Sequence, residues 1–573
     1  MAGCKFSIKL NRLCKSSSDS IDNINEFDSF KSYMHVVRTA EEDLKELLRK
    51  VNASGKKTLV LLCGSAGDGK SHLLSYLKNL DEEHLLDQYH VYNDATESSA
   101  PSKTAIETLN EFLEPYKDSN LEIPGRNVIL AINLGVLSNF IESQYGDEYS
   151  VLRNYVANNN ILTVQVGKNE YDVNSYFQHV SFSDYHMYSL TEKGVHAEYI
   201  ENILDKVFCS KEENVFYWAY KEFCSICPLS QKCPVKKNYE YMMKSERQRF
   251  VAELLVKMTI QDKFILTTRE LLNFIYNILV SQEFSYRKFQ ELLVDESAYI
   301  KEFLKQVTPT LLFDSADVTV LLTLLKKYDP LLNRSEEVDD NAISYYVSSD
   351  VSFEVRKAFV ENTFGDVICE NNIIAKINED KYLKSSVYNS IVRVMAIDRG
   401  FIPGDIYGKY LKDLYWYNSG NDKKLRTLYG MVEKAVTQWC GSDEEGSICL
   451  ENKHKGFCLY EKVKFDASPN LVSCSVETGE LQRFVPTIVT AFELYGKVIK
   501  LEINYSLYET IYKLNQGYIQ TADDRNNYTD FISFVNCILQ TGTLAKSLSV
   551  ISEDGRKAII SQDRFGYKFK VVK

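Results

Sequence analysis

The segment KKTLVLLCGSAGDGKSHLLSYLKNL, residues 56–80, decides the fold of the N-terminal part of the chain. It opens with a short apolar run typical of a strand that is buried on both faces, and it closes with a run of helical character. Between the two runs, residues 64–71 match the pattern G-x-x-x-x-G-K-[ST] in full. This pattern forms a phosphate-binding loop when it joins a strand to a helix, which is the order found here.

The residues of this loop have separate roles in nucleotide binding. Glycines allow the backbone to curl until successive N–H groups face the phosphates. We expect Lys70 to reach the β and γ phosphates of ATP, or with less support of GTP, and Ser71 to give its hydroxyl to Mg²⁺. The next helix would direct the positive end of its dipole at the anion. The predicted nucleotide-binding residues are Gly64, Ser65, Ala66, Gly67, Asp68, Gly69, Lys70, Ser71 and His72.

Strand and helix patterns alternate around the loop. Besides the run before Gly64, strands are predicted at 90–95, 127–133 and 175–185, and helices at 37–51, 71–80 and 102–117. The Asn-rich stretch 145–175 has the pattern of an irregular insertion. The alternation predicts an α/β P-loop NTPase domain with a doubly wound parallel sheet, AAA-like in type.

The whole chain is too long for one hydrophobic core, since 573 residues predict two to four domains. Apolar residues recur at helical spacing from 251 to 420, and alternating strand patterns follow. The expected division is an N-terminal arm and helix (1–55), a P-loop NTPase core (56–205), a cysteine cluster (206–250), a mainly helical lid or interaction region (251–420) and a C-terminal α+β domain with antiparallel strands (421–573).

Hydrolysis of a nucleotide needs a second group, usually a carboxylate at the end of another strand. The run 127–133 ends instead in Asn133, followed by Leu134, so the expected acid is missing. Asn133 could orient water or the γ-phosphate, while Asp94, Glu97 or Asp184 supplies the carboxylate; Asp94 fits a strand-end turn equally well. The predicted catalytic residues are Lys70, Asp94 and Asn133, and slow or lost hydrolysis is the alternative.

Arginines further along the chain could approach the phosphates. In ILTTRELLNFIYNIL, Thr268 is a plausible helix N-cap, which puts Arg269 in the first helical turn. A cation is unfavourable there by dipole alone, so a lid arginine is one interpretation and a solvated surface arginine the other. Arg393 and Arg399 suggest the same role with less support.

Three cysteines, Cys224, Cys227 and Cys233, lie within ten residues, and C-x-x-C spacing suits two thiolates that bind one metal. Cys209 is the nearest candidate for a fourth ligand, with His196 and His179 more distant. We predict a structural Zn²⁺ site made of Cys209, Cys224, Cys227 and Cys233. Unliganded buried thiols are the alternative, and a redox pair is disfavoured because no thioredoxin-like pattern surrounds it.

Charge and hydropathy limit the possible partners. The net charge of -12 opposes a surface that grips nucleic acid throughout, so DNA contact would be local. The candidate patch comprises Lys232, Lys236, Lys237, Lys244, Arg247 and Arg249, and a solvated helix face is its alternative. No signal-peptide core and no membrane-length apolar run is present in the sequence, which predicts a cytoplasmic protein without membrane contact.

Several stretches of the sequence resemble the DptF family, the F subunits of bacterial DNA phosphorothioation-dependent restriction systems. They are GSAGDGKSH (64–72), YNDATES (92–98), ILAINLGVLSNF (129–140), CSICPLSQKCPVKKNYE (224–240), LTTRELLNFIYNIL (266–279), LYWYNSGNDKKLRTLY (414–429) and RFGYKFK (564–570). The resemblance runs over most of the chain. Only the phosphate-binding loop among these stretches is mechanistically specific.

The resemblance implies a P-loop ATPase subunit that acts with G and H subunits in a complex attacking DNA that lacks the host's sulfur-modified backbone. Family roles carry over to Gly64, Gly67, Gly69, Lys70 and Ser71. At position 134, where related ATPases are expected to have an acidic residue, this chain has leucine, which argues against hydrolysis. No nuclease motif is evident in the sequence. The expected function is therefore an ATP-binding, ATP-hydrolysing subunit in antiviral defence. A non-hydrolysing, nucleotide-stabilised scaffold and a STAND-like signalling switch are the alternatives.

Overall fold

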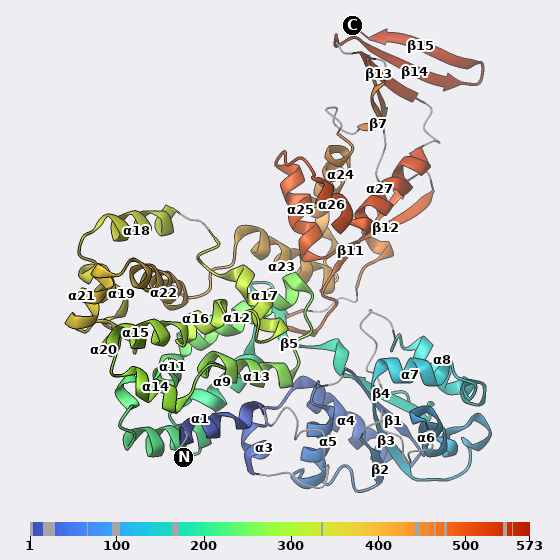
Figure 1. Ribbon diagram of the computed structural model, residues 1–573. Helices are drawn as coiled ribbons and strands as arrows, with labels where there is room; N and C mark the ends of the chain where they lie inside the picture. The colour runs from blue at the N-terminus through green and yellow to red at the C-terminus, as the bar shows by residue number, and fades with distance from the viewer. Residues whose placement is uncertain are drawn as a thin grey trace. The chain divides into compact units, whose positions relative to one another are not determined.

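The computed structural model describes residues 4–14, 29–65, 67–93, 104–162, 171–333, 336–441, 447–454, 456–462, 466–474, 478–494, 496–542, 547–552 and 554–572. The chain divides into two compact units (Figure 1). The first comprises Met1–Tyr188 and Ala197–Phe401, and the second comprises Ser189–His196 and Ile402–Lys573. The second unit begins before the boundary at 421 expected from sequence, and the finer division into five segments stays a prediction.

A four-stranded, all-parallel sheet organises the N-terminal part of the first unit, in the order β2-β3-β1-β4. Its strands are β1 (Leu59–Cys63), β2 (Tyr89–Tyr92), β3 (Asn127–Ile132) and β4 (Phe177–Ser181). The predicted α/β class is confirmed by this sheet. Because all four strands are parallel, their carboxyl ends meet at one edge, where open α/β sheets bind ligands.

The central strand β1 is buried on both faces. Leu59, Leu61 and Cys63 pack against the helices that follow β2 and β3, whereas Val60 and Leu62 pack against the helices that flank the 64–71 loop. The helices of the two faces are visible on either side of the sheet in Figure 1. They are α4 (Thr39–Ser54) and α5 (Lys70–Asn79) on one face, and α6 (Ala105–Phe112), α7 (Leu134–Ile141) and α8 (Ser150–Asn158) on the other.

The interval 145–175 is more regular than its Asn-rich sequence suggests. It contains the 3-10 turn η3 (Gly146–Tyr149) and α8, and Leu152 and Val156 of α8 enter the core. The expectation of an irregular insertion is wrong for residues 146–158, and 163–170 lie outside the described residues. Two apolar side chains spaced four apart suffice to anchor a short helix when a sheet face is available to cover.

The rest of the first unit is helical, as the apolar periodicity predicts. Before the sheet lie α1 (Lys5–Leu10) and α3 (Ser29–Met34). After it come α9 (Glu198–Phe208), α10 (Val215–Ala219), the π-helical turn η5 (Tyr220–Cys224), α11 (Pro234–Met242), α12 (Ser245–Asp262), α13 (Thr268–Leu279), α14 (Tyr286–Leu292), α15 (Glu296–Lys305), α16 (Thr308–Phe313), α17 (Val320–Leu325), α18 (Glu336–Val347), α19 (Ser352–Phe359), α20 (Gly365–Ile368), α21 (Asn371–Glu379) and α22 (Lys381–Arg399).

The second unit is α+β with antiparallel strands, as predicted. One sheet has the order β12-β11-β9 and another the order β15-β14-β13-β8-β7. A third, β10-β5-β6, includes residues 189–196. The elements are β5 (Tyr185–Thr191), β6 (Gly194–His196), α23 (Asp405–Asn418), α24 (Arg426–Trp439), β7 (Ser447–His454), β8 (Phe457–Lys462), β9 (Asp466–Ala467), β10 (Leu481–Arg483), β11 (Ile488–Leu494), β12 (Lys497–Ile503), α25 (Tyr505–Asn515), α26 (Ala522–Asn527), α27 (Thr529–Gly542), β13 (Ser547–Ser552), β14 (Lys557–Asp563) and β15 (Gly566–Val572).

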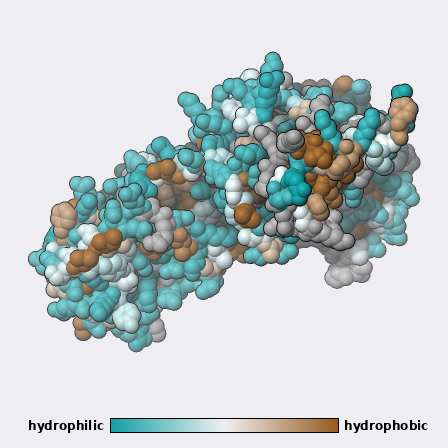
Figure 2. All heavy atoms as spheres, turned by 90° about the horizontal axis from the view of Figure 1, so that it is seen from above, coloured by the Kyte–Doolittle hydropathy of each residue, from teal (hydrophilic) through white to brown (hydrophobic). Residues whose placement is uncertain are grey.

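The surface is mainly hydrophilic in the view of Figure 2, with apolar residues in separate groups. Among the helices in the described part of the chain, none combines the length and the apolar character that a bilayer crossing requires.

The side chain of Asn238, in α11, forms hydrogen bonds to residues near the ends of α13, α15 and α16. Replacement of Asn238 tests how much these bonds stabilise the first unit. The buried amide of Asn238 donates to the carbonyls of Leu279 (3.0 Å) and Gln306 (2.7 Å) and accepts from the Thr308 N–H (2.8 Å). We expect Asn238→Ala to lower the free energy of unfolding by about 3 kcal/mol, because it leaves buried backbone groups without partners. Urea unfolding followed by circular dichroism measures the loss. Asn372→Ala, which removes an exposed amide bonded to Glu296, should change it little.

Candidate functional site

The loop 64–71 leaves the sheet at the carboxyl end of β1, and the structure favours glycine at two of its positions for different reasons. Gly64 and Gly67 have φ angles of 156° and 88°. A Cβ on Gly64 would lie 2.8 Å from Oδ2 of Asp68 and 2.9 Å from Cβ of Phe182, and one on Gly67 would lie 3.3 Å from Oγ1 of Thr267. A side chain at Gly64 would therefore displace its neighbours, whereas Gly67 is favoured mainly by its positive φ angle.

The loop ends at the start of α5, where no side chain caps the helix. Its N-cap is Gly69, so the first N–H groups of α5 are accessible to an anionic ligand from outside the helix. The Lys70 Nζ donates to the Ser65 carbonyl at 2.6 Å, and the Ser65 N–H donates to Oδ2 of Asp68 at 2.5 Å. Burial raises the pKa of Asp68, against the opposing effect of the Lys70 charge.

A cavity of about 230 Å³ opens beside this loop. Residues 67–73, from the loop and the first turn of α5, form one wall. Its other walls come from α3 and the segment before α4, from the ends of β2, β3 and β4, and from α9 and α13. Those walls comprise Phe30, Lys31, Met34, His35, Val36, Arg38, Glu41, Asn93, Ala131, Asn133, Phe182, Tyr199, Ile203, Thr268, Arg269 and Leu272.

Two asparagines stand at the strand ends in this cavity. Asn133 caps α7, since its Oδ1 accepts from the Gly135 N–H at 2.9 Å. Asn133 can therefore offer a ligand its amide N–H donors and the remaining lone pair of Oδ1. Asn93, directly after β2, has a buried Oδ1 without a hydrogen-bond partner among the described residues. The strand order places β3, which leads to Asn133, between β1 and β2.

Arg269 lines the same cavity, as the hypothesis of a lid arginine requires. Its buried Nε has no hydrogen-bond partner within the described part of the chain. The N-cap of α13 is Thr267, one residue earlier than predicted, because Glu270 completes a capping box with it. Arg393 is elsewhere, buried in an ion pair with Asp329 at 2.6 Å. Neither Arg393 nor Arg399 lines the cavity.

Several polar residues of the cavity lie before α4 and were not found from sequence, because no motif marks them. The Arg38 Nη1 donates to the Asp68 carbonyl at 2.8 Å, and its guanidinium lies over the rings of Phe182 and Tyr199, at 5.4 and 5.0 Å. Arg38 thereby ties the segment before α4 to the loop.

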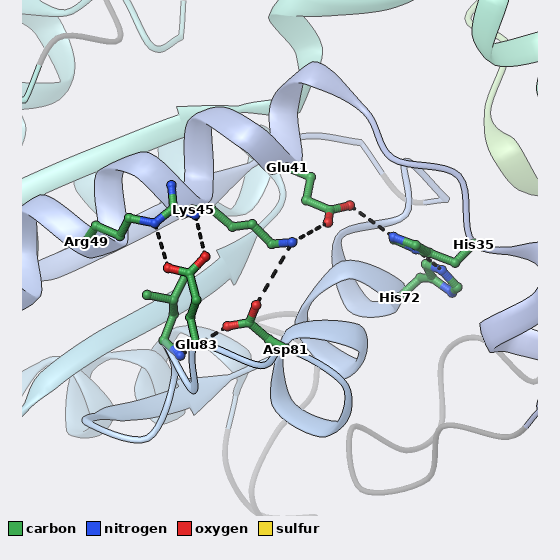
Figure 3. Close-up of polar contacts among 8 residues, drawn as sticks. His35, Glu41, Lys45, Arg49, His72, Asp81 and Glu83 are labelled. Atoms are coloured by element: carbon green, nitrogen blue, oxygen red, sulfur yellow. Dashed lines mark hydrogen bonds and ion pairs between the residues drawn. The ribbon is translucent and has the colours of Figure 1, made fainter.

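A chain of polar contacts runs from the cavity along α4 (Figure 3). His35 Nδ1 lies 3.1 Å from His72 Nε2, and His35 Nε2 lies 3.2 Å from Glu41 Oε2. Glu41 also pairs with Lys45 at 2.9 Å, and the His35 ring stacks on Tyr76 with centroids 3.8 Å apart. Burial, together with the charges of His35 and Lys31, lowers the pKa of His72 to about 4, so His72 is neutral at pH 7.

Some predicted residues are not placed in the cavity. Ala66, Asp94 and Glu97 lie outside the described residues. Asp184, in the 3-10 turn after β4, is described but does not line the cavity. The carboxylates that do line it within the described chain are Glu41 and Asp68, and both bind protein groups.

Four cysteines line a second cavity, and one of the four is not the one predicted. Cys224, Cys227 and Cys233 line a common cavity, and the fourth thiol that lines it is Cys4. Cys209 lies elsewhere: its Sγ is 3.7 Å from the Tyr33 hydroxyl and 3.7 Å from Nδ2 of Asn214. Sequence proximity favours Cys209 as the fourth ligand, whereas in the fold α1 places Cys4 beside the other three cysteines.

The predicted basic patch is not a common surface. Lys237 and Arg247 are buried and bonded to Asp366 and Asp398, each at 2.6 Å. Lys236 pairs with Glu240 at 2.7 Å. Lys244 and Arg249 are exposed. The cluster therefore serves mainly the internal structure of the first unit.

Comparisons with models of known protein families, with curated proteins and with solved structures gave no match to this chain.

The neutral His72 predicts a pH dependence of stability. Its pKa is lower in the folded state than in the unfolded chain, so unfolded molecules take up the proton first and stability falls as the pH drops from about 6.5 toward 4. The groups that face it are His35, Lys31 and Glu41. Between pH 7.5 and 5 this contributes a loss of about 2 kcal/mol. Urea unfolding at both pH values measures it: His72→Gln should remove this part of the pH dependence, and exposed His84→Gln should not. Identical pH profiles for wild type and His72→Gln would contradict the assignment.

Proposed function

We propose that this chain is an ATPase that binds ATP with Mg²⁺ at the 64–71 loop. The observation that carries the proposal is the course of the loop from the end of buried β1 into an uncapped helix. A side chain at Gly64 would collide with its neighbours, and Gly67 and Gly69 have positive φ angles that favour glycine. Backbone N–H groups at such a turn bind phosphate without specialised side chains. The loop sequence and its position at the carboxyl edge of a parallel sheet support the same function.

The residues present fit the nucleotide. The N–H groups at the start of α5 and the Lys70 ammonium would hold the phosphates, and the Ser71 hydroxyl would bind Mg²⁺, whose charge would neutralise the phosphates. In this structure the Lys70 ammonium donates to the Ser65 carbonyl. On nucleotide binding, a phosphate oxygen would replace that carbonyl as the acceptor. The buried Nε of Arg269, unpartnered among the described residues, is the donor that an anionic ligand in this cavity would satisfy.

The apolar part of the cavity suits a purine base, and the carboxylates of the cavity favour adenine over guanine. Phe30, Met34, Val36, Ile203 and Leu272 line it, which suits the flat face of a purine. Recognition of guanine by its N–H donors commonly uses a carboxylate acceptor. The cavity carboxylates in the described chain, Glu41 and Asp68, are already bonded to His35, Lys45 and Ser65. ATP is therefore the preferred nucleotide.

Hydrolysis requires groups that orient water and stabilise the transferred phosphoryl group. We assign these roles to Asn133 and Asn93, at neighbouring strand ends, and to Arg269 on α13. Asp94 directly follows Asn93 in sequence and is the carboxylate we assign to the metal. The engagement of Glu41 and Asp68 favours the second candidate, a nucleotide-stabilised scaffold without turnover. Turnover measurements separate the two functions.

The place of this activity in the cell rests on the sequence resemblance. We propose that the chain is the ATPase subunit of a restriction complex that acts with G- and H-type subunits on DNA lacking phosphorothioate. The dispersal of the basic residues around Cys233 favours DNA contact through those partners. Nuclease activity would reside in a partner.

Replacement of Lys70 tests nucleotide binding at the loop. We expect Lys70→Ala to abolish phosphate release from Mg·ATP and to weaken ATP binding, because it removes the ammonium that would hold the phosphates. Lys78→Ala, at the exposed end of the same helix, should retain both. Phosphate release is measured at steady state with and without duplex DNA. Turnover that survives Lys70→Ala undiminished would place the activity elsewhere.

Replacement of Arg269 tests its assignment to the transferred phosphoryl group. Arg269→Ala should lower kcat on the order of 100-fold while ATP still binds, since a donor that acts in the transition state affects rate more than ground-state affinity. Arg249→Ala, an exposed arginine of the same unit, is the matched control. An equal loss of affinity and rate would make Arg269 a binding residue, and no effect would remove it from the site.

A further inference from the structure

The second cavity, of about 180 Å³, is lined by four cysteines that come from separate parts of the first unit. Cys4 is the N-cap of α1, Cys224 ends the π-helical turn η5, and Cys233 is the N-cap of α11. Cys227 lies in the turn between η5 and α11, where its carbonyl accepts from the Ser230 N–H at 3.1 Å. Cys4 lies far from the other three in sequence, so no C-x-x-C spacing includes it.

The four thiols belong to one local environment. Cys224 lies close enough to Cys4, Cys227 and Cys233 to interact electrostatically with all three. Helix α1 is held there by Phe6, whose ring packs edge to face against Tyr239 and Tyr220, with centroids at 5.2 and 6.1 Å. Packing thus brings Cys4 to the cavity without help from the thiols themselves.

Hydrogen bonds point at the sulfur atoms. The Ser7 N–H donates to Sγ of Cys4 at 3.4 Å. Backbone N–H groups of Val235 and Lys236 interact with the Cys233 sulfur, and the Tyr286 hydroxyl interacts with Cys227. Donors of this kind orient sulfur atoms as metal ligands.

The remaining walls are largely apolar. They are formed by Phe6, Phe223, Ile226, Leu229, Phe284 and Phe289, with Lys5 and Ser230 as further polar members. Among the described residues, none that lines this cavity carries a carboxylate or an imidazole. Four sulfur ligands in an apolar enclosure select a soft metal centre and exclude Mg²⁺ or Ca²⁺.

The arrangement of the four thiols bears on whether they bind one ion or a cluster. A single Zn²⁺ would need all four sulfur atoms about 2.3 Å from one point, and so about 3.8 Å from one another. Within the described residues, no group of three or more Cys, His, Asp or Glu side chains has an arrangement that could hold one metal ion. The thiols instead line a cavity of about 180 Å³. An iron–sulfur cluster fills such a volume, because each thiolate binds a different iron.

We propose that Cys4, Cys224, Cys227 and Cys233 bind a [4Fe–4S] cluster. The cluster joins the start of the described chain to the turn before α11, and it closes a site that α1 and the cysteine segment each form only in part. This replaces the single zinc ion expected from the C-x-x-C spacing, and it replaces Cys209 with Cys4.

Metal analysis of the full chain, purified without oxygen, tests the proposal. We expect about four iron and four acid-labile sulfide per chain, with the visible absorption of a cluster that bleaches on exposure to air. Stoichiometric zinc without sulfide would overturn the cluster in favour of a single-ion site. A preparation without metal that also fails to take up iron and sulfide in reconstitution would overturn metal binding altogether.

Two serine variants identify the ligands. Cys4→Ser should lose most of the iron and sulfide, whereas Cys209→Ser, a cysteine of the same unit outside the cavity, should retain them. Full retention in Cys4→Ser would overturn the assignment of the fourth ligand. If Cys4→Ser fails to fold, Cys227→Ser and the metal content of the wild-type chain still decide whether the cluster exists.

Discussion

The burial of β1 on both faces fixes the position of the strand between the two helix layers, and the chain leaves the sheet after Cys63, at its carboxyl end. Burial also raises the pKa of the Cys63 thiol to about 12, so this residue serves the core as an apolar group. The loop after it turns into α5 through Gly64, Gly67 and Gly69, whose positive φ angles favour glycine. The other residues of the candidate nucleotide site come from elements that pack around that turn. Helix α4 packs on β1 and brings His35 and Arg38, and α13 brings Thr267 and Arg269.

The cavity that results is cationic in an acidic chain. Lys31, Arg38, Lys70 and Arg269 converge on it, although the net charge of the chain is -12. The carboxylates present are held by partners, and His72 remains neutral because burial disfavours its charged form. The local charge therefore suits a polyphosphate, while the overall charge would repel extended nucleic acid. The apolar end of the same cavity gives a purine a surface to cover.

Sequence alone predicts those elements whose signal is local. The apolar run of β1, the spacing of Leu44, Leu47 and Leu48 in α4 and the pattern of the 64–71 loop all lie within short windows. It misses what packing decides. Helix α8 has only Leu152 and Val156 to mark its buried face, and Asn93 carries no motif. Thr267 and Thr268 are equally suitable N-cap residues by sequence. Thr267 is the N-cap because Glu270, three residues later, completes a capping box with it. Cys4 joins the cysteine cluster through the packing of Phe6, which no cysteine spacing reveals.

The most direct test of the account is isothermal titration of the full chain with ATP, with and without Mg²⁺, and with GTP in competition. We expect one site per chain that prefers ATP and binds more weakly when Mg²⁺ is chelated, because the loop, Lys70 and Ser71 would act on phosphate and metal together. No binding of either nucleotide at millimolar concentration would contradict it and would make the loop a structural turn.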